Sequence, residues 1–174
     1  MIKQFVPSDY CLNKCRMCCR FSQQESVWSP CLLDKEIEEL PKHNIPASVI
    51  TPGKKIRLAP FPEKNNSNLP AHIGPIFVCP FLNTQNNKCE IYVLRPFECQ
   101  LYPFLINKKD KKVFLSVDLG CPYAKENINS AGFQEYTQRL FELLNKADYL
   151  GAIRKNPQII QAYEDALDLR ELNI

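Results

Sequence analysis

Residues 11–19 read CLNKCRMCC, and this run holds four cysteines in nine positions. Spacings of two or three residues let successive thiolates turn inward around one metal centre without straining the backbone. Thiolates this close together repel one another unless a cation compensates their charge, and a bound metal keeps them ionised by lowering their pKa. The run therefore predicts metal binding rather than a group of buried apolar side chains. The predicted ligands here are Cys11, Cys15, Cys18 and Cys19.

Cys18 and Cys19 are adjacent in this run, which constrains the geometry of any centre. Neighbouring side chains on extended backbone point to opposite faces, so both rarely complete one tetrahedron. We therefore expect Cys19 to serve a second centre or to bridge two metals. Cysteines further along the chain supply the remaining predicted ligands, which are Cys79, Cys89, Cys99 and Cys121. Eight ligands suit two four-ligand centres or one binuclear site with shared thiolates.

The ninth cysteine, Cys31, lies apart from both groups. Free cysteine is among the most buried residue types, so we expect Cys31 to be a small core residue. The odd total argues against a framework made only of disulfides. The first residues also lack the apolar core of a secretory signal, which favours a cytoplasmic protein with reduced thiols.

The chain has 174 residues, of which 45% are hydrophobic and 24% are charged. This is the composition of one ordinary soluble domain, which can bury a core without help from metals or disulfides. The net charge of +3 is too small to predict a nucleic acid or an anionic membrane as partner. No apolar run approaches the roughly 20 residues that a membrane span requires.

Turn residues and apolar periodicity predict a single α+β domain over residues 1–174. In this prediction, a cysteine-rich loop-and-hairpin region over 11–123 wraps around the metal and packs on a helical buttress over 130–172. Apolar residues three or four positions apart predict the first buttress helix over 130–150. The pair at 156–157, Asn-Pro, opens the second helix, because proline suits the first helical position.

Prolines and polar turns delimit the smaller predicted elements. A helix over 33–40 begins near Asp34 and is stopped by Pro41. The other expected elements are strands at 56–59 and 75–79, a polar loop at 61–74, a turn at 83–88 that brings Cys79 and Cys89 together, a turn or one short helical piece within 91–103, and a hairpin of 105–106 with 113–117 around a charged tip at 107–112.

Two longer blocks of sequence contain most of these cysteines. One is Cys11-Leu-Asn-Lys-Cys15-Arg-Met-Cys18-Cys19, and the other is Cys89-Glu-Ile-Tyr-Val-Leu-Arg95-Pro96-Phe-Glu-Cys99-Gln-Leu-Tyr102-Pro103-Phe104. Together with Cys79-Pro-Phe-Leu and Cys121, these blocks occur in the same order as the motifs of the CxxCxxCC cysteine-cluster family. The chain resembles this family over roughly residues 11–123. This family is also called the YkgJ family, or the zinc- or iron-chelating domain.

The resemblance implies metal binding by the matched cysteines. Members are often labelled iron–sulfur oxidoreductases, and their cysteine pattern is shared with flagellin lysine N-methylases. The chain departs from the family pattern in two places. Its first spacing is three residues instead of two, which matters little to ligation. Gln100 replaces the arginine usual in the CRxYPF block, which removes a positive charge near the centre and counts against an anion-binding role there.

The metal itself is not decided by the ligand type, because all-cysteine ligation suits both structural zinc and iron–sulfur clusters. Zinc would make the protein a closed scaffold, whereas an iron–sulfur cluster would permit electron transfer. We favour iron–sulfur, since two dedicated zinc sites are superfluous in a chain that forms its own core. The number of centres, one or two, stays open.

Arg95 is the candidate cofactor-binding residue. It lies between an aromatic-rich turn and a cysteine, where it would neutralise an anionic thiolate centre or bind a carboxylate or phosphate. The alternatives are a surface ion pair or packing between loops. Tyr92 and Tyr102 are expected in the core with satisfied hydroxyls, and His43 and His72 in exposed polar loops.

Three functions follow from this pattern. The first is a metal-cluster protein in electron transfer or oxidoreduction, or an accessory to a modifying enzyme, working with a protein or redox partner. The second is a zinc module for protein interaction. The third is a radical or methyl-transfer enzyme, because Cys11-x3-Cys15-x2-Cys18 has the spacing of the radical S-adenosylmethionine motif. Against the third, Met17 stands in place of an aromatic residue, and no glycine-rich nucleotide loop is present.

Overall fold

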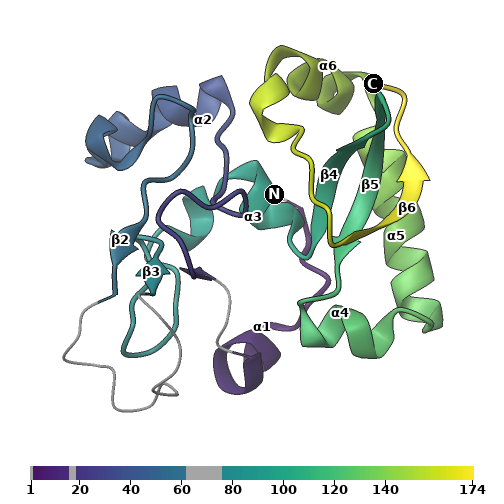
Figure 1. Cartoon of the computed structure of the whole chain (residues 1–174), viewed down its shortest axis with the longest axis horizontal. Coiled ribbons are helices and arrows are strands. Elements are labelled where there is room, and N and C mark those ends of the chain that lie inside the picture. The colour runs from purple at the N-terminus through teal and green to yellow at the C-terminus, as the bar shows by residue number, and fades with distance from the viewer. Residues whose placement is uncertain (1, 16–18, 62–75) are drawn as a thin grey trace.

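Two antiparallel sheets, each of three strands, organise the part of the chain that the structure describes (Figure 1). This computed structural model describes residues 2–15, 19–61 and 76–174. The smaller sheet pairs β1 (Arg20–Phe21), β3 (Phe77–Val78) and β2 (Ala59–Pro60) in that order. The C-terminal sheet pairs β4 (Phe104–Lys109), β5 (Lys112–Asp118) and β6 (Ala166–Glu171).

Helices lie around both sheets, so the predicted α+β class is confirmed. They are α1 (Ser8–Tyr10), α2 (Asp34–Glu39), α3 (Phe97–Leu101), α4 (Pro122–Asn127), α5 (Ala131–Leu144) and α6 (Ala147–Lys155). Single 3₁₀ turns occur at Leu40–His43, Ala47–Val49, Tyr92–Leu94 and Pro157–Ile159, and a π turn at Cys11–Cys15. Among the described residues, no helix has both the length and the apolar character needed to cross a membrane.

The β4–β5 hairpin confirms the predicted hairpin and lengthens its strands. Lys109 pairs with Lys112, which narrows the tip to Asp110 and Lys111. Both tip residues have positive φ, 48° and 65°. Positive φ at two central residues is typical of a type I′ turn, whose twist matches that of the flanking strands.

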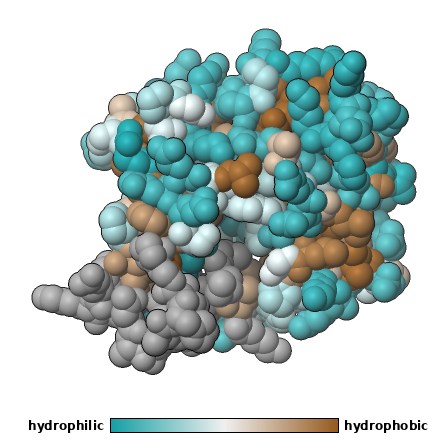
Figure 2. All heavy atoms as spheres, viewed as in Figure 1, coloured by the Kyte–Doolittle hydropathy of each residue, from teal (hydrophilic) through white to brown (hydrophobic). Residues whose placement is uncertain are grey.

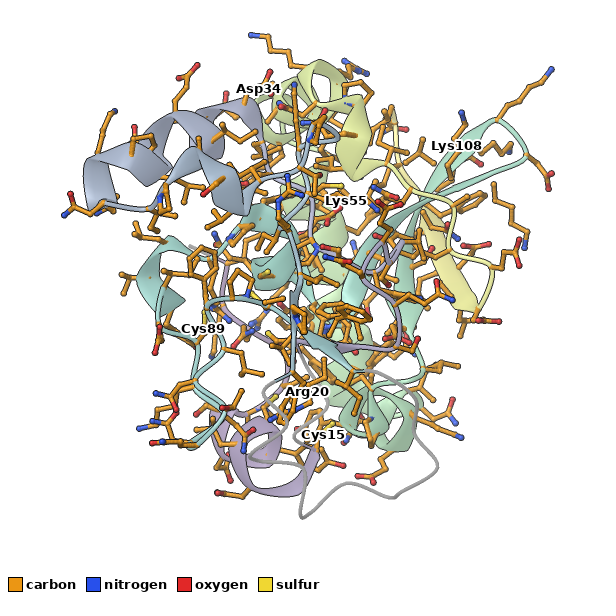
Figure 3. All side chains as sticks on the ribbon, turned by 60° about the vertical axis from the view of Figure 1, so that its left-hand side comes forward. Cys15, Arg20, Asp34, Lys55, Cys89 and Lys108 are labelled. Carbon is orange, nitrogen blue, oxygen red and sulfur yellow. The ribbon has the colours of Figure 1, made fainter. Side chains whose placement is uncertain are left out.

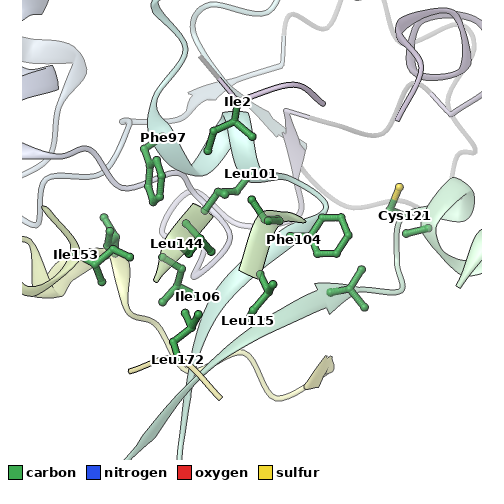
Figure 4. Close-up of a cluster of buried hydrophobic side chains, with 14 of the residues drawn as sticks. Ile2, Phe97, Leu101, Phe104, Ile106, Leu115, Cys121, Leu144, Ile153 and Leu172 are labelled. Atoms are coloured by element: carbon green, nitrogen blue, oxygen red, sulfur yellow. The ribbon is translucent and has the colours of Figure 1, made fainter. Parts of the chain in front are cut away.

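The larger hydrophobic core packs against the C-terminal sheet (Figure 4). Phe104 is fully buried, and its ring centroid lies 5.4 Å from that of Phe133 and 5.3 Å from that of Tyr136. Helix α5 provides this contact because its inward residues recur every three or four positions. Its buried residues are Phe133, Thr137, Leu140 and Leu144. Ser130 caps the helix by accepting a hydrogen bond from the backbone N–H of Phe133.

The helix predicted over 130–150 is wrong as one element, because α5 ends at Leu144 and α6 begins at Ala147. The side-chain Nδ2 of Asn145 donates to the carbonyl of Phe141 at 3.0 Å. Asparagine competes in this way with backbone hydrogen bonds, which disfavours a helix interior. Lys146 then adopts extended backbone, with φ −69° and ψ 146°.

The second predicted helix, opening at 156–157, is also wrong. The chain makes only a 3₁₀ turn at Pro157–Ile159, and Ala166–Glu171 forms β6 on the edge of β5. The strand reads ALDLRE, an alternation that fits period two as well as the helical spacing over so few residues. The region 130–172 is therefore two helices followed by a sheet strand, instead of a two-helix buttress.

A second, smaller core lies between α2 and the smaller sheet. Its buried residues are Leu32, Leu40, Ile45, Ile56, Val78, Cys79 and Leu82. The helix predicted at 33–40 is confirmed as α2, although Leu33 takes the capping position instead of Asp34. Pro41 does not stop the helical path, since proline fits the first turn of the 3₁₀ segment that follows.

The predicted strands of this region are present but short. The strand expected at 56–59 is displaced to β2, and the strand expected at 75–79 is reduced to β3. The turn expected at 83–88 is confirmed, because the backbone N–H of Asn83 donates to the carbonyl of Lys88 at 2.9 Å. Nearly all of the loop predicted at 61–74 lies outside the described residues.

Helix α3 lies between the two sheets and is tied to the N-terminal region by buried carboxyl groups (Figure 1). Glu36 accepts a hydrogen bond from the backbone N–H of Phe97 at 2.6 Å. Glu98 accepts one from the backbone N–H of Cys31, also at 2.6 Å. Burial raises the pKa of both carboxyls, that of Glu98 to about 8. These bonds fix the helix that carries Cys99.

Asp168 on β6 joins the sheet through hydrogen bonds from Ser116 Oγ at 2.7 Å and Asn107 Nδ2 at 2.9 Å. Both donors are buried. We expect Asp168→Ala to lower the free energy of unfolding by about 1–3 kcal/mol, because it leaves these donors unpaired. Urea unfolding with Asp168→Asn as the matched control tests this, since asparagine retains an acceptor oxygen. Equal stability of wild-type protein and Asp168→Ala would contradict the expectation.

The same carboxyl predicts a pH dependence. Burial opposes its ionisation, but the bonds from Ser116 and Asn107 and the nearby Lys109 ammonium outweigh burial and lower the pKa of Asp168. A lowered folded-state pKa adds stability above the unfolded pKa, which is lost as the pH falls through the folded value. We therefore expect the stability advantage of wild-type protein over Asp168→Asn to shrink below about pH 4.

Candidate metal centres

The described cysteines that the sequence predicts as ligands form two separate sets of free thiols. The first thiol set is Cys11, Cys15 and Cys121, and the second thiol set is Cys19, Cys79, Cys89 and Cys99. Electrostatic effects between thiols are found within each set. Figure 3 labels one member of each, Cys15 and Cys89, which lie apart with Arg20 between them in that view. Cys18 lies outside the described residues.

The first thiol set joins the π turn to the start of α4. Cys11 and Cys15 are the two ends of the π turn, a rare conformation found mostly at functional sites. Cys121 is the N-cap residue of α4, and the backbone N–H groups of Ala124 and Tyr123 lie near its sulfur. Cys121 also borders the larger core (Figure 4), so one side of this set faces apolar packing.

Burial is the main cause that raises the pKa of the Cys121 thiol, and the thiols of Cys15 and Cys11 raise it further. The two N–H donors act in the opposite direction by favouring the thiolate. Tyr10 lies beside the set, with its ring centroid 4.9 Å from that of Tyr123 and its hydroxyl donating to Glu126. A bound cation would shift this balance toward the thiolate.

The second thiol set is assembled by the smaller sheet and by α3. The backbone N–H of Cys79 donates to the carbonyl of Cys19 at 3.0 Å, and their side chains are also hydrogen-bonded. Cys19 has φ 66°, in the left-handed region that non-glycine residues rarely adopt. The turn after Leu82 returns the chain to Cys89 through an antiparallel bridge, and α3 supplies Cys99.

Three thiols of the second set, those of Cys19, Cys89 and Cys99, have raised pKa values and favour the protonated form. The hydrogen bond with Cys79 and burial raise the pKa of Cys19 well above its ordinary value. Burial does the same to Cys99, with further contributions from Cys19 and other neighbours. For Cys89, burial outweighs the N–H of Ile91, which donates to its sulfur and lowers its pKa. Metal binding here must therefore displace protons from sulfur.

The donor set fits zinc or iron–sulfur in kind, because soft thiolates select these metals. The second set offers four thiols, the number that an all-cysteine centre uses. Within residues 2–15, 19–61 and 76–174, however, no three cysteine, histidine or carboxylate side chains are grouped closely enough to hold a metal ion. The sulfurs of each set must therefore approach one another before they ligate.

The remaining candidates of the sequence analysis have mixed outcomes. Cys31 is a core residue as expected, with 0% exposure and a hydrogen bond from Gln161. Tyr102 donates its hydroxyl to Asp118, as expected of a satisfied tyrosine. Tyr92 is not a core residue, because 46% of it is exposed at the surface turn Tyr92–Leu94. His43 is exposed as expected, and His72 lies outside the described residues.

Sequence reasoning missed Tyr10 and Arg20 as neighbours of the thiols. Tyr10 lies close enough for Cys15 and Cys121 to raise its pKa, although burial and Glu126 contribute more. Arg20 lies close enough to Cys19 to lower the pKa of that thiol. The available signal was position, because each of these side chains directly adjoins a cysteine of the CLNKCRMCC run.

The family model CxxCxxCC, described as "Putative zinc- or iron-chelating domain", matches residues 10–122. This span includes every cysteine of both thiol sets. No curated protein and no solved structure matches the chain.

Proposed function

Because the chain belongs to the CxxCxxCC family of zinc- or iron-chelating domains, we propose that it holds metal in two separate cysteine centres. One is the first thiol set, with Cys18 as the fourth ligand predicted from the sequence, and the other is the second thiol set. The partition of the thiols carries this proposal. Cys15 and Cys19 are four residues apart, yet Cys15 acts on Cys121 and Cys19 is bonded to Cys79.

We propose iron–sulfur clusters as the occupants and electron transfer or oxidoreduction as the activity, or service to a modifying enzyme. A bound cluster supplies one-electron transfer at a potential set by burial and by hydrogen bonds to sulfur. The chain provides both, since Cys79 and Cys121 are buried, the backbone N–H of Ile91 donates to Cys89, and two backbone N–H groups lie near the sulfur of Cys121. A reducing compartment such as the cytoplasm suits these free thiols.

A structural zinc module is the second candidate, and the second thiol set favours it. Four thiols from separate elements would supply all four donors of a structural zinc ion and leave no open position for chemistry. In that case, the centre would hold β1, β3 and α3 together. The activity would then be the binding of a protein partner.

Metal content and an ultraviolet–visible spectrum of anaerobically purified protein distinguish these candidates. We expect iron with acid-labile sulfide and a broad band near about 400 nm, as thiolate-ligated clusters show. Zinc in a colourless solution would support the interaction module and contradict electron transfer. Protein that holds neither metal, and takes up neither after reconstitution under reducing conditions, would contradict both. A Cys31→Ser variant is the matched control, because its thiol belongs to neither set.

A further inference from the structure

Arg95 is a buried cation at the second thiol set. It lies between Cys89 and Cys99 in the chain, and only 8% of the residue is exposed. Its Nε donates to the carbonyl of Tyr92 at 3.1 Å, and its guanidinium carbon lies 3.9 Å from the centre of the Tyr92 ring. Gln100 holds the backbone of Arg95 by donating to its carbonyl at 2.8 Å. The side chain is thus held in one position before any metal binds.

No carboxylate neutralises this guanidinium among the residues that the structure describes, where the ion pairs involve other side chains. A buried charge without a counter-ion is costly, so an anion must compensate it in the functional state. Three thiols of the second set, those of Cys19, Cys89 and Cys99, lie within electrostatic range of this guanidinium. The surroundings therefore point to thiolate sulfur as the missing anion.

We propose that Arg95 is the counter-charge of the metal centre formed by the second thiol set, an inference that rests on the proposed function. Four thiolates around a divalent metal leave a net negative charge on the centre. A buried guanidinium next to that charge stabilises the metal-bound form over the protonated form. At Cys19 the effect of Arg20 is larger than that of Arg95, but Arg95 also acts on Cys89 and Cys99. This role differs from binding a soluble carboxylate or phosphate, for which a guanidinium so little exposed is poorly placed.

The test measures zinc affinity of the reduced, metal-free full chain by competition with a chromophoric chelator. We expect Arg95→Gln to weaken one zinc site by about 10- to 100-fold and to leave the other unchanged, as loss of an outer-shell partner does. Arg95→Lys should retain most of the affinity because it retains the charge. Arg154→Gln is the matched control, because the exposed Arg154 lies far from the cysteines in the sequence and its guanidinium donates to the carbonyl of Asn173 at 2.7 Å. Arg20→Gln should weaken the same site by a smaller factor.

Three results would overturn the inference. An unchanged zinc affinity in Arg95→Gln would show that the charge of Arg95 does not stabilise the metal-bound form. Equal losses of affinity in Arg95→Gln and Arg95→Lys would show that Arg95 acts by packing on Tyr92 instead of by its charge. Weakening of both zinc sites in parallel would indicate a general loss of structure, which circular dichroism of the metal-free variants detects. If wild-type protein binds no zinc under reducing conditions, the same variants are compared by the iron that they take up on reconstitution, and a wild-type protein that takes up neither metal contradicts the proposed function itself. If Arg95→Gln does not fold, Arg95→Met takes its place in the comparison with Arg95→Lys, because methionine keeps the apolar packing on Tyr92 without the charge.

Discussion

Serine variants at Cys15 and Cys19 are expected to lose metal from different centres. Each should retain about half of the wild-type metal, because removal of one thiolate opens one four-ligand site and leaves the other complete. The double variant should retain none. The measurement is metal per chain by elemental analysis after anaerobic purification, with Cys121→Ser expected to behave like Cys15→Ser and Cys99→Ser like Cys19→Ser.

The control for these variants is Cys31→Ser, which removes a buried thiol outside both sets and should retain full metal content. Complete loss of metal from Cys15→Ser and from Cys19→Ser alike would indicate one shared site and contradict the two-centre proposal. Cys18→Ser extends the test to the residue that the structure does not describe. Because Cys18 is the proposed fourth ligand of the first thiol set, we expect Cys18→Ser to retain as much metal as Cys15→Ser.

Phe104→Ala is expected to lower the free energy of unfolding by about 3–5 kcal/mol. The side chain is 0% exposed, and its ring contacts those of Phe5, Phe133 and Tyr136. Truncation therefore removes buried apolar area and leaves a cavity that rigid aromatic neighbours fill poorly. Urea unfolding of metal-free protein under reducing conditions measures the change without a contribution from the metal.

Val93→Ala is the matched control, because 73% of Val93 is exposed and its truncation should change stability by less than about 0.5 kcal/mol. A loss below about 1 kcal/mol in Phe104→Ala would contradict the packing described for the larger core. The metal content of Phe104→Ala is informative as well. Retention of both centres would show that the thiol sets tolerate loosening of the C-terminal sheet.

Local patterns predicted the hairpin of β4 and β5 because the charged tip and the flanking apolar strands lie within one short stretch. The same reasoning failed at β6, where six residues fit helical and strand periods equally and only the edge of β5 decides. The split at Asn145 was missed for a similar reason. The side chain of Asn145 donates to the carbonyl of Phe141 where α5 ends. Whether the helix ends at this bond or continues depends on the surrounding packing, which the local sequence does not reveal.

The candidate site, like the fold, could be predicted from the sequence only in part. Adjacency of Cys18 and Cys19 predicted that Cys19 serves a different centre, and this stays a prediction. Membership of the sets was beyond sequence reasoning, because Cys121 joins Cys11 and Cys15 from more than 100 residues away. The exposed position of Tyr92 was equally hidden, since it depends on how the short turn places its ring under the Arg95 guanidinium.

The position of β6 at the end of the C-terminal sheet has a consequence for biosynthesis. Every thiol of both sets leaves the ribosome before the strand that completes this sheet, because Cys121 precedes Ala166 by 45 residues. At about 5–20 residues per second, synthesis leaves an interval of seconds in which all of the proposed ligands are present and the sheet is incomplete. During that interval, the nascent chain is exposed to the metal pool and to oxidants of the cell. Metal loading during translation would thus protect the thiols before the core has closed.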